Sequence, residues 1–193
     1  MIEIKKVTTN KKQYLPLLLL ADEQEDMIDR YLERGTMYIL DDNGVKGVCV
    51  VTDEGDGILE IKTLQRIRNF HRKGYGRMLI KFIEETYHNQ YSILQVGTGD
   101  SPLTIPFYEA CGFVRSHAVK DFFVKNYDHA IYECGIQLKD MIYLSKKPRI
   151  EQKKEAKTIA RFSPARLLLL LFRSFFSFYS PIRSNTISYP SFP

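Results

Sequence analysis

Alternating polar and apolar positions open the chain, and helical spacing soon replaces them. The alternation from Ile2 to Val7 predicts a first strand. Residues 11–21 and 23–34 then carry apolar side chains at helical spacing, and Gly35 is placed where the second helix would end. The chain is therefore expected to begin with one strand and two helices.

Three apolar runs come next, separated by turn sequences. Asn43 and Gly44 join the first two runs, and the glycine-containing residues 53–57 join the second to the third. Both loop positions of a two-residue hairpin need a positive φ, which Asn and Gly tolerate. The pattern predicts a meander of three strands over residues 36–40, 45–52 and 58–65.

The second half of the chain alternates between helical and extended patterns. The expected helices cover residues 74–88 and 102–111, and the expected strands cover residues 91–96, 113–114 and 141–144. A meander joined to a β-α-β-α unit differs from a doubly wound sheet. The expected fold class is α/β (α+β), with a mixed, mostly antiparallel central sheet flanked by helices.

Charge divides the chain into two regions. Residues 1–148 hold 20 Lys and Arg against 21 Asp and Glu, whereas residues 149–193 hold 8 against 2. Residues 1–148, the body of the chain, are nearly neutral. This argues against nucleic acid as a partner, because a nucleic-acid-binding domain needs a basic face. We therefore expect one domain over residues 1–148 and a basic, apolar C-terminal extension over residues 149–193 that is not part of the fold.

The extension has three interpretations. Its apolar run at residues 167–172 is interrupted by Arg173 and is far shorter than the roughly 20 residues of a spanning helix. Mixed basic and aromatic residues fit a segment at a membrane surface, and the polar and proline content fits disorder. The third interpretation is an extension without a selected fold, such as a shifted reading frame at the end of the gene. No membrane is expected for the body.

Cysteine usage points to a reducing compartment. Cys49, Cys111 and Cys134 are widely spaced, odd in number and not part of a metal-binding pattern. The first residues do not form a secretory signal. We expect a cytoplasmic protein with no metal, either a monomer or a homodimer.

A glycine-containing turn opens the helix expected from residue 74. Such a turn presents backbone N–H groups to one point, and the helix dipole adds partial positive charge there, so a pyrophosphate fits. By itself the motif also fits an ordinary turn before an amphipathic helix. A P-loop is excluded because its GxxxxGK[ST] pattern is absent, and a dinucleotide fingerprint would need glycine where Leu79 stands. The turn and its basic neighbours are His71, Arg72, Lys73, Gly74, Tyr75, Gly76 and Arg77.

Three segments together resemble the GNAT superfamily of N-acetyltransferases over about residues 1–147. These are the strand Ile58–Lys62, the turn Arg72–Gly76 and the sequence Phe107-Tyr108-Glu109-Ala110-Cys111-Gly112-Phe113. The resemblance implies the GNAT acyl-CoA N-acyltransferase fold. It also implies direct transfer of an acetyl group from acetyl-CoA, bound as co-substrate, to a primary amine of a small molecule in a ternary complex.

The resemblance also implies roles for individual residues. Tyr108 would donate a proton to the departing thiolate, and Glu60 would act through water as the base that deprotonates the amine. The competing interpretations are that Tyr108 only packs beside Phe107 and that Glu60 only pairs with Lys62. His129 is a second candidate base. The implied coenzyme-binding residues are Leu64, Gln65, Arg66, His71, Arg72, Lys73, Gly74, Tyr75, Gly76, Arg77 and Ser101.

Departures from the superfamily pattern leave two other functions open. Gln65 and Arg66 replace small or apolar residues, His71 stands where Gln or Arg is usual, and Arg68 replaces a common proline. An acetyl-CoA-binding module with little or no catalysis is the alternative that these departures suggest. A membrane-surface protein led by its extension is the third candidate.

Acidic residues crowd the second expected helix and the turn before it. In the GNAT fold the first two helices border the acceptor site, so this field would attract a cationic amine. A solvated acidic helix face explains the same pattern. The residues are Asp22, Glu23, Glu25, Asp26, Asp29 and Glu33.

Overall fold

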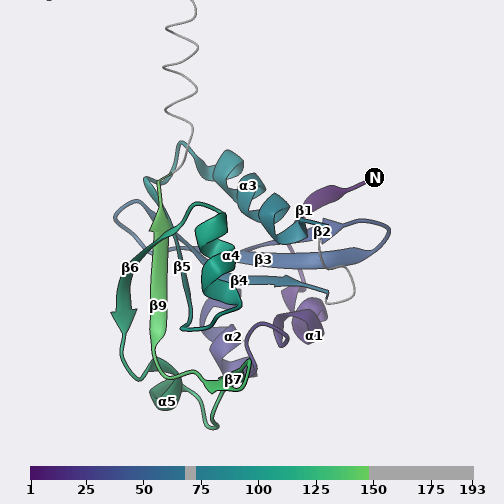
Figure 1. Ribbon diagram of the computed structural model, residues 1–193. Coiled ribbons are helices and arrows are strands. Elements are labelled where there is room, and N and C mark those ends of the chain that lie inside the picture. Colours follow the sequence, from purple (N-terminus) through teal and green to yellow (C-terminus); the bar gives the residue numbers. More distant parts are fainter. Residues whose placement is uncertain (68–72, 148–193) are drawn as a thin grey trace, which may run out of the picture. The chain divides into compact units, whose positions relative to one another are not determined.

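The computed structural model describes residues 1–67 and 73–147 (Figure 1). The expected extension at residues 149–193 lies outside this range, as do Arg68, His71 and Arg72. The strands of the main sheet are β1 (Glu3–Val7), β2 (Thr36–Asp41), β3 (Val45–Asp53), β4 (Ile58–Arg66), β5 (Ile93–Gly99), β6 (Val114–Val119) and β9 (Met141–Lys146). The remaining elements are the 3₁₀ helix η1 (Lys11–Tyr14), α1 (Leu15–Leu18), α2 (Glu25–Leu32), α3 (Tyr75–Tyr87), α4 (Thr104–Ala110), α5 (Phe122–Asn126), β7 (Tyr132–Glu133) and β8 (Ile136–Gln137).

Within these residues the main sheet has seven strands in the order β1-β2-β3-β4-β5-β9-β6. Strands β4 and β5 run parallel, and every other neighbouring pair is antiparallel. The predicted mixed, mostly antiparallel sheet is therefore confirmed. The hairpin signal is confirmed too, because Asn43 and Gly44 have φ angles of 54° and 103° between β2 and β3.

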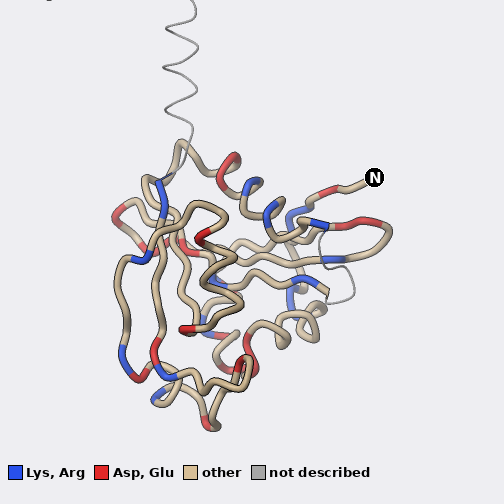
Figure 2. Tube along the Cα trace, in the orientation of Figure 1, with Lys and Arg blue, Asp and Glu red and all other residues tan. Residues whose placement is uncertain are grey.

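Each face of the sheet buries a separate apolar cluster. On one face, α3 packs Leu79 and Ile83 against Ile61 of β4 and Val96 of β5. On the opposite face, α2 lays Ile28, Tyr31 and Leu32 over Val48 and Val50 of β3. Alternation along the central strands supplies both faces, because successive side chains point to opposite sides. Charges of both signs are interspersed along the described chain (Figure 2).

The parallel pair β4–β5 is short, and this shapes the centre of the sheet. Ile58–Ile61 pair with Ile93–Val96, and the register between these strands ends there. The β3–β4 register shifts beside Lys62, which is the extra residue of a β-bulge. Beyond the bulge β4 pairs with β3 alone, while Gly97–Gly99 of β5 pair with β9. The two strands therefore separate and leave one edge of β4 open.

The structure differs from the sequence prediction mainly at the N-terminal helices and after β6. The helix expected over residues 11–21 is split into η1 and α1, because Pro16 fits the first turn of a helix but not its interior. Helix α2 covers Glu25–Leu32 of the expected residues 23–34. Helix α5 and the β7–β8 hairpin were not predicted, because elements of two to five residues leave no measurable periodicity.

No helix in residues 1–67 and 73–147 is long and apolar enough to span a membrane.

A buried ion pair joins β9 to α3 and provides a test of the packing. The Lys146 Nζ atom lies 2.5 Å from Glu84 Oε1 and donates a hydrogen bond to the Cys111 carbonyl at 2.7 Å. We expect Lys146→Met to lower the free energy of unfolding by about 3 kcal/mol, because it leaves a buried carboxylate without its partner. Urea unfolding measures this. The double variant Lys146→Met/Glu84→Leu should recover most of the loss, and equal losses in both variants would contradict the argument.

Candidate active site

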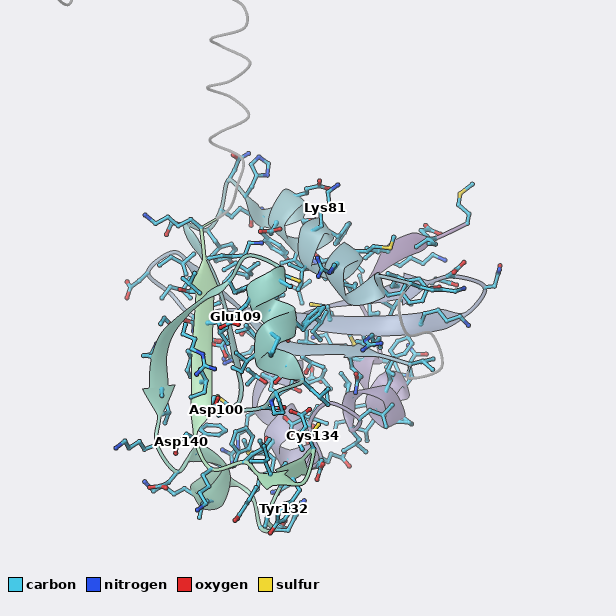
Figure 3. The ribbon with its side chains drawn as sticks, in the orientation of Figure 1. Lys81, Asp100, Glu109, Tyr132, Cys134 and Asp140 are labelled. Atoms are coloured by element: carbon cyan, nitrogen blue, oxygen red, sulfur yellow. The ribbon has the colours of Figure 1, made fainter. Side chains whose placement is uncertain are left out.

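A cleft of about 310 Å³ lies where β4 and β5 separate. Its lining comes from the open part of β4, the glycine-rich end of β5, the turn after α1, helix α4 and the segment from α5 to β9. Figure 3 shows Tyr132, one of the lining residues, on β7 at the end of the molecule where α5 lies. The cleft thus lies between the two halves of the sheet and is bordered by elements from five parts of the chain.

The open edge of β4 offers backbone donors to this cleft. Ile67 donates its N–H to Lys46 of β3, whereas the Arg66 N–H points away from β3 and donates to Oε1 of Gln65. Because N–H directions alternate along a strand, the Leu64 N–H faces the same edge as that of Arg66. Helix α2 fixes the position of this stretch through a 2.6 Å hydrogen bond between the hydroxyls of Tyr31 and Thr63.

The N-terminus of α3 carries the predicted pyrophosphate turn. Gly74 is the N-cap residue with φ 76°, and no atom lies within 4 Å of the place a Cβ would occupy. The first intrahelical bond runs from Met78 N–H to Gly74 O, so the N–H groups of Gly76 and Arg77 precede it and point out of the helix end. With the dipole of a 13-residue helix behind them, these groups suit an anion.

Side chains of the turn are held by the rest of the fold. The Tyr75 hydroxyl donates a 2.6 Å hydrogen bond to Asp42 in the β2–β3 hairpin, and this contact raises the pKa of Tyr75 to about 12. Arg77 donates to the Ala110 carbonyl at 3.3 Å. A Cβ on Gly76 would lie 3.0 Å from Cζ of Phe107, so glycine there also allows α3 to approach α4. His71 and Arg72 lie outside the described residues.

Tyr108 of α4 faces the cleft from within the core. Its side chain is 7% exposed and packs edge-on against Phe107 and Phe113 at centroid distances of 5.1 and 5.6 Å. Tyr108 lines the cleft, and its hydroxyl forms no hydrogen bond with the described residues. Burial raises the pKa of Tyr108 well above its ordinary value. The hydroxyl therefore keeps its proton at neutral pH and can donate it to a group in the cleft.

Glu60, the predicted base, lies outside the cleft lining. Its Oε1 receives a 2.7 Å hydrogen bond from Lys62, and its Oε2 receives one of 2.7 Å from Gln95. The structure therefore brings Leu64, Gln65 and Tyr108 to one cleft but does not bring Glu60 to it. The pairing of Glu60 with Lys62 that the sequence offered as an alternative is present.

Ser101 and His129 are also absent from the cleft lining, as are Arg66 and the predicted residues Lys73–Arg77. Ser101 is buried, and its Oγ accepts a hydrogen bond from the Leu103 N–H at 3.1 Å, which shapes the turn before α4. His129 is exposed and lies 2.5 Å from Asp128 and 3.5 Å from Glu23. The hydrogen bond to Asp128 raises the pKa of His129.

The sequence missed the wall that the segment from α5 to β9 adds to the cleft. A Cβ on Gly97 would lie 2.7 Å from the Met141 sulfur, and a Cβ on Gly99 would lie 2.5 Å from Leu138. Both glycines therefore let this wall pack directly on β5. Glycine inside an apolar strand is a known sign of such a close approach. The spacing of Gly97 and Gly99 was the signal from which the wall could have been found.

The other missed contact joins this wall to the turn after α1. Tyr127 donates a 2.9 Å hydrogen bond to Oδ1 of Asp22, and the Asp128 N–H donates to the Gln24 side chain at 3.2 Å. Asp22 lines the cleft, and burial raises its pKa. Residues more than a hundred positions apart thus meet at the mouth of the cleft, which no local pattern could reveal.

The shifted pKa of Asp22 predicts a pH dependence of stability. Because burial raises this pKa in the folded chain, the folded state binds the proton more tightly than the unfolded state. Proton binding by Asp22 therefore stabilises the folded state below the ordinary pKa of 3.8. This contribution is lost as the pH rises through the raised pKa. We expect Asp22→Asn to raise the free energy of unfolding above that of the parent protein, and to raise it more at pH 7 than at pH 4. Urea unfolding at both values tests this, with Asp29→Asn as the exposed control, and an unchanged pH dependence would contradict it.

Comparisons with known proteins agree with this geometry. The family model described as an acetyltransferase (GNAT) domain matches residues 33–115. The uncharacterized N-acetyltransferase YvbK of Bacillus subtilis (strain 168) is 35% identical over 139 residues, which are 70% of this chain and 89% of that protein.

Two solved structures extend the similarity to the whole domain. A GNAT family acetyltransferase from Elizabethkingia anophelis with acetyl-CoA bound has 33% identity and a TM-score of 0.72, over 76% of this chain and 97% of that one. A Bacillus subtilis acetyltransferase in complex with CoA has 31% identity and a TM-score of 0.69, over 76% and 99% of the two chains. The agreement of sequence, fold and cleft shows that this chain belongs to the GNAT family and is an N-acetyltransferase.

Proposed function

We propose that the protein transfers an acetyl group from acetyl-CoA to the primary amine of a small molecule by direct attack in a ternary complex. The observation that carries this proposal is the buried, unpartnered hydroxyl of Tyr108 in a cleft bordered by open backbone donors. The similar structures from Elizabethkingia anophelis and Bacillus subtilis hold acetyl-CoA and CoA, which supports acetyl-CoA as the donor.

The residues present fit the coenzyme. The N–H groups at the start of α3 would bind the pyrophosphate, and Lys73 precedes them. His71 and Arg72, which the sequence also predicted for this site, lie outside the described residues. The open edge of β4 would bind the pantetheine arm through the backbone of Leu64 to Arg66. The Leu64 N–H would also polarise the thioester carbonyl, where negative charge develops as the amine attacks.

Tyr108 would complete the transfer by supplying a proton. As the new C–N bond forms and the C–S bond breaks, the electron pair of the broken bond stays on sulfur. The Tyr108 hydroxyl would donate its proton to that thiolate, and its raised pKa keeps the proton available until then. Glu60 remains the predicted base for the amine. Because it lies outside the cleft and is held by Lys62 and Gln95, it would act through water.

One observation supports an acetyl-CoA-binding module with little catalysis as the second candidate. The Gln65 side chain bonds the Arg66 N–H and the Leu20 carbonyl, so it occupies part of the β4 edge that the coenzyme would use. Binding of acetyl-CoA without release of thiol to any amine would favour this alternative.

A cytoplasmic location is part of the same proposal. Cys49 is buried, Cys111 is partly buried and Cys134 is exposed, and all three are free thiols. Free thiols persist in a reducing compartment, which supports the location without depending on the acceptor.

Tyr108→Phe tests the proton donor. We expect kcat to fall by about 100-fold or more, because general acid catalysis contributes at least this much, while the affinity for acetyl-CoA stays within about twofold. Thiol release followed with a chromogenic disulfide, together with calorimetric binding, measures both quantities. Tyr132→Phe, which removes the hydroxyl of an exposed cleft residue, is the matched control. Unchanged kcat in Tyr108→Phe would exclude the proposed role.

Gly74→Asp tests the pyrophosphate site. A carboxylate at the start of α3 would repel the phosphates, so we expect the Kd for acetyl-CoA to rise by more than tenfold. Gly55→Asp is the control, because Gly55 has a similar φ of 82° and equally open surroundings in the β3–β4 turn. Equal loss of affinity in both variants, measured by calorimetry, would show that backbone strain and not the site explains the effect.

A further inference from the structure

The acceptor end of the cleft has an apolar wall. Phe123, Ile131 and Leu138 form a small buried cluster, each less than 9% exposed, and Met141 packs against it. All four residues line the cleft. The wall stands directly on β5 because that strand carries glycine opposite Leu138 and Met141. An apolar surface of this kind at a binding cleft favours an apolar part of the ligand.

The mouth of the same cleft is acidic. Asp22, Glu23 and Glu133 belong to the lining, and Lys62 is the basic residue among the described lining residues. The Lys62 ammonium lies 2.7 Å from Glu60 and 3.3 Å from Glu54, so its charge is balanced outside the cleft. The lining therefore carries an excess of negative charge that favours a cationic ligand.

This acidic mouth differs from the acidic face expected on the second helix. Glu25 and Asp29 of α2 pair with Lys12 at 2.9 and 2.8 Å, and neither lines the cleft. The sequence suggested six acidic residues that would attract a cationic acceptor. Of these, Asp22 and Glu23 line the cleft. Asp22 is also fixed in place by Tyr127, whereas the α2 acids are exposed side chains.

The Tyr108 hydroxyl is a further polar feature of the same cleft. The Tyr108 hydroxyl belongs to a side chain that is more than nine-tenths buried, and it faces the cleft with no partner among the described residues. Leaving such a group unpaired costs about 1–3 kcal/mol unless a ligand or water satisfies it. The apolar wall, the acidic mouth and this hydroxyl therefore surround one volume.

We infer that the acceptor is a small primary amine with a compact apolar body and no carboxylate, such as an arylalkylamine. Asp22 and Glu133 attract its ammonium, and the body lies against Phe123, Leu138 and Met141. A carboxylate beside the amine is repelled by the acids of the mouth, and a long polyamine gains nothing from the apolar wall. The cleft, at about 310 Å³, also holds the reactive end of the coenzyme, so the acceptor is small. This inference rests on the proposed acetyl transfer.

The test compares three amines on the full chain. 2-Phenylethylamine carries the apolar body, phenylalanine adds a carboxylate to it, and spermidine is cationic without an apolar body. We expect kcat/KM for 2-phenylethylamine to exceed both others by at least tenfold. Asp22→Asn should lower that value about tenfold, whereas Glu25→Gln should leave it unchanged. Preference for phenylalanine or spermidine, or equal effects of the two variants, would overturn the inference.

A binding measurement separates this inference from the proposed function. The affinity for 2-phenylethylamine is measured by calorimetry with CoA present, for the parent and for Asp22→Asn. Binding that weakens in Asp22→Asn, without thiol release from acetyl-CoA, would contradict acetyl transfer and support the amine site. Turnover of other amines without binding of 2-phenylethylamine would support acetyl transfer and contradict the amine site. If the protein neither bound 2-phenylethylamine nor released thiol with any amine, both the amine site and acetyl transfer would be overturned.

Discussion

The separation of β4 from β5 is the constraint on which the rest of the structure depends. The strands share four residue pairs, from Ile58–Ile93 to Ile61–Val96, and the bulge at Lys62 then turns β4 away. A sheet interior normally satisfies every backbone group through a neighbouring strand. On the open edge of β4 the Gln65 side chain accepts from the Arg66 N–H, and the Leu64 N–H faces the cleft. The same separation makes room for Tyr108 and for the wall from α5 to β9. One local irregularity thus produces the open edge of β4, the access of Tyr108 to the cleft and the space beside the wall, which are the features on which the proposed function rests.

Burial raises the pKa of two groups in the cleft, the Tyr108 hydroxyl and the Asp22 carboxyl. For Asp22 this burial lowers the stability of the folded protein at neutral pH. The core around Phe107 and Phe113 keeps Tyr108 protonated, while the contact with Tyr127 holds Asp22 in a partly buried place that disfavours its charge. A group kept in an unfavourable environment is common where function requires it. Asp22 therefore costs stability at neutral pH in this environment, which is consistent with the proposal that it binds the acceptor.

Much of the fold could be predicted from the sequence, and less of the site. Period-two and helical patterns, with the turn at Asn43-Gly44, located helix α3 and the main-sheet strands except β6, of which the predicted residues 113–114 cover only Val114. The glycine turn was predicted from its residues as one possible pyrophosphate site, whereas the role of Tyr108 followed from the resemblance alone. The wall from α5 to β9 was signalled by Gly97 and Gly99 alone, because α5 and β7–β8 are too short for a pattern and the Asp22–Tyr127 contact spans 105 positions. The sequence could not show that Glu60 is held by Lys62 and Gln95, because that depends on the β4–β5 register.

The open edge of β4 can be tested directly by amide hydrogen exchange. In the protein alone the Leu64 N–H faces the cleft without a strand beside it, whereas the flanking N–H of Ile67 is bonded to Lys46. We expect acetyl-CoA to slow exchange at Leu64 by at least tenfold, because the pantetheine arm would occupy this edge. Exchange at Ile67 should change far less. Saturating acetyl-CoA that leaves Leu64 unprotected would contradict the central claim that the separated strands form the coenzyme site.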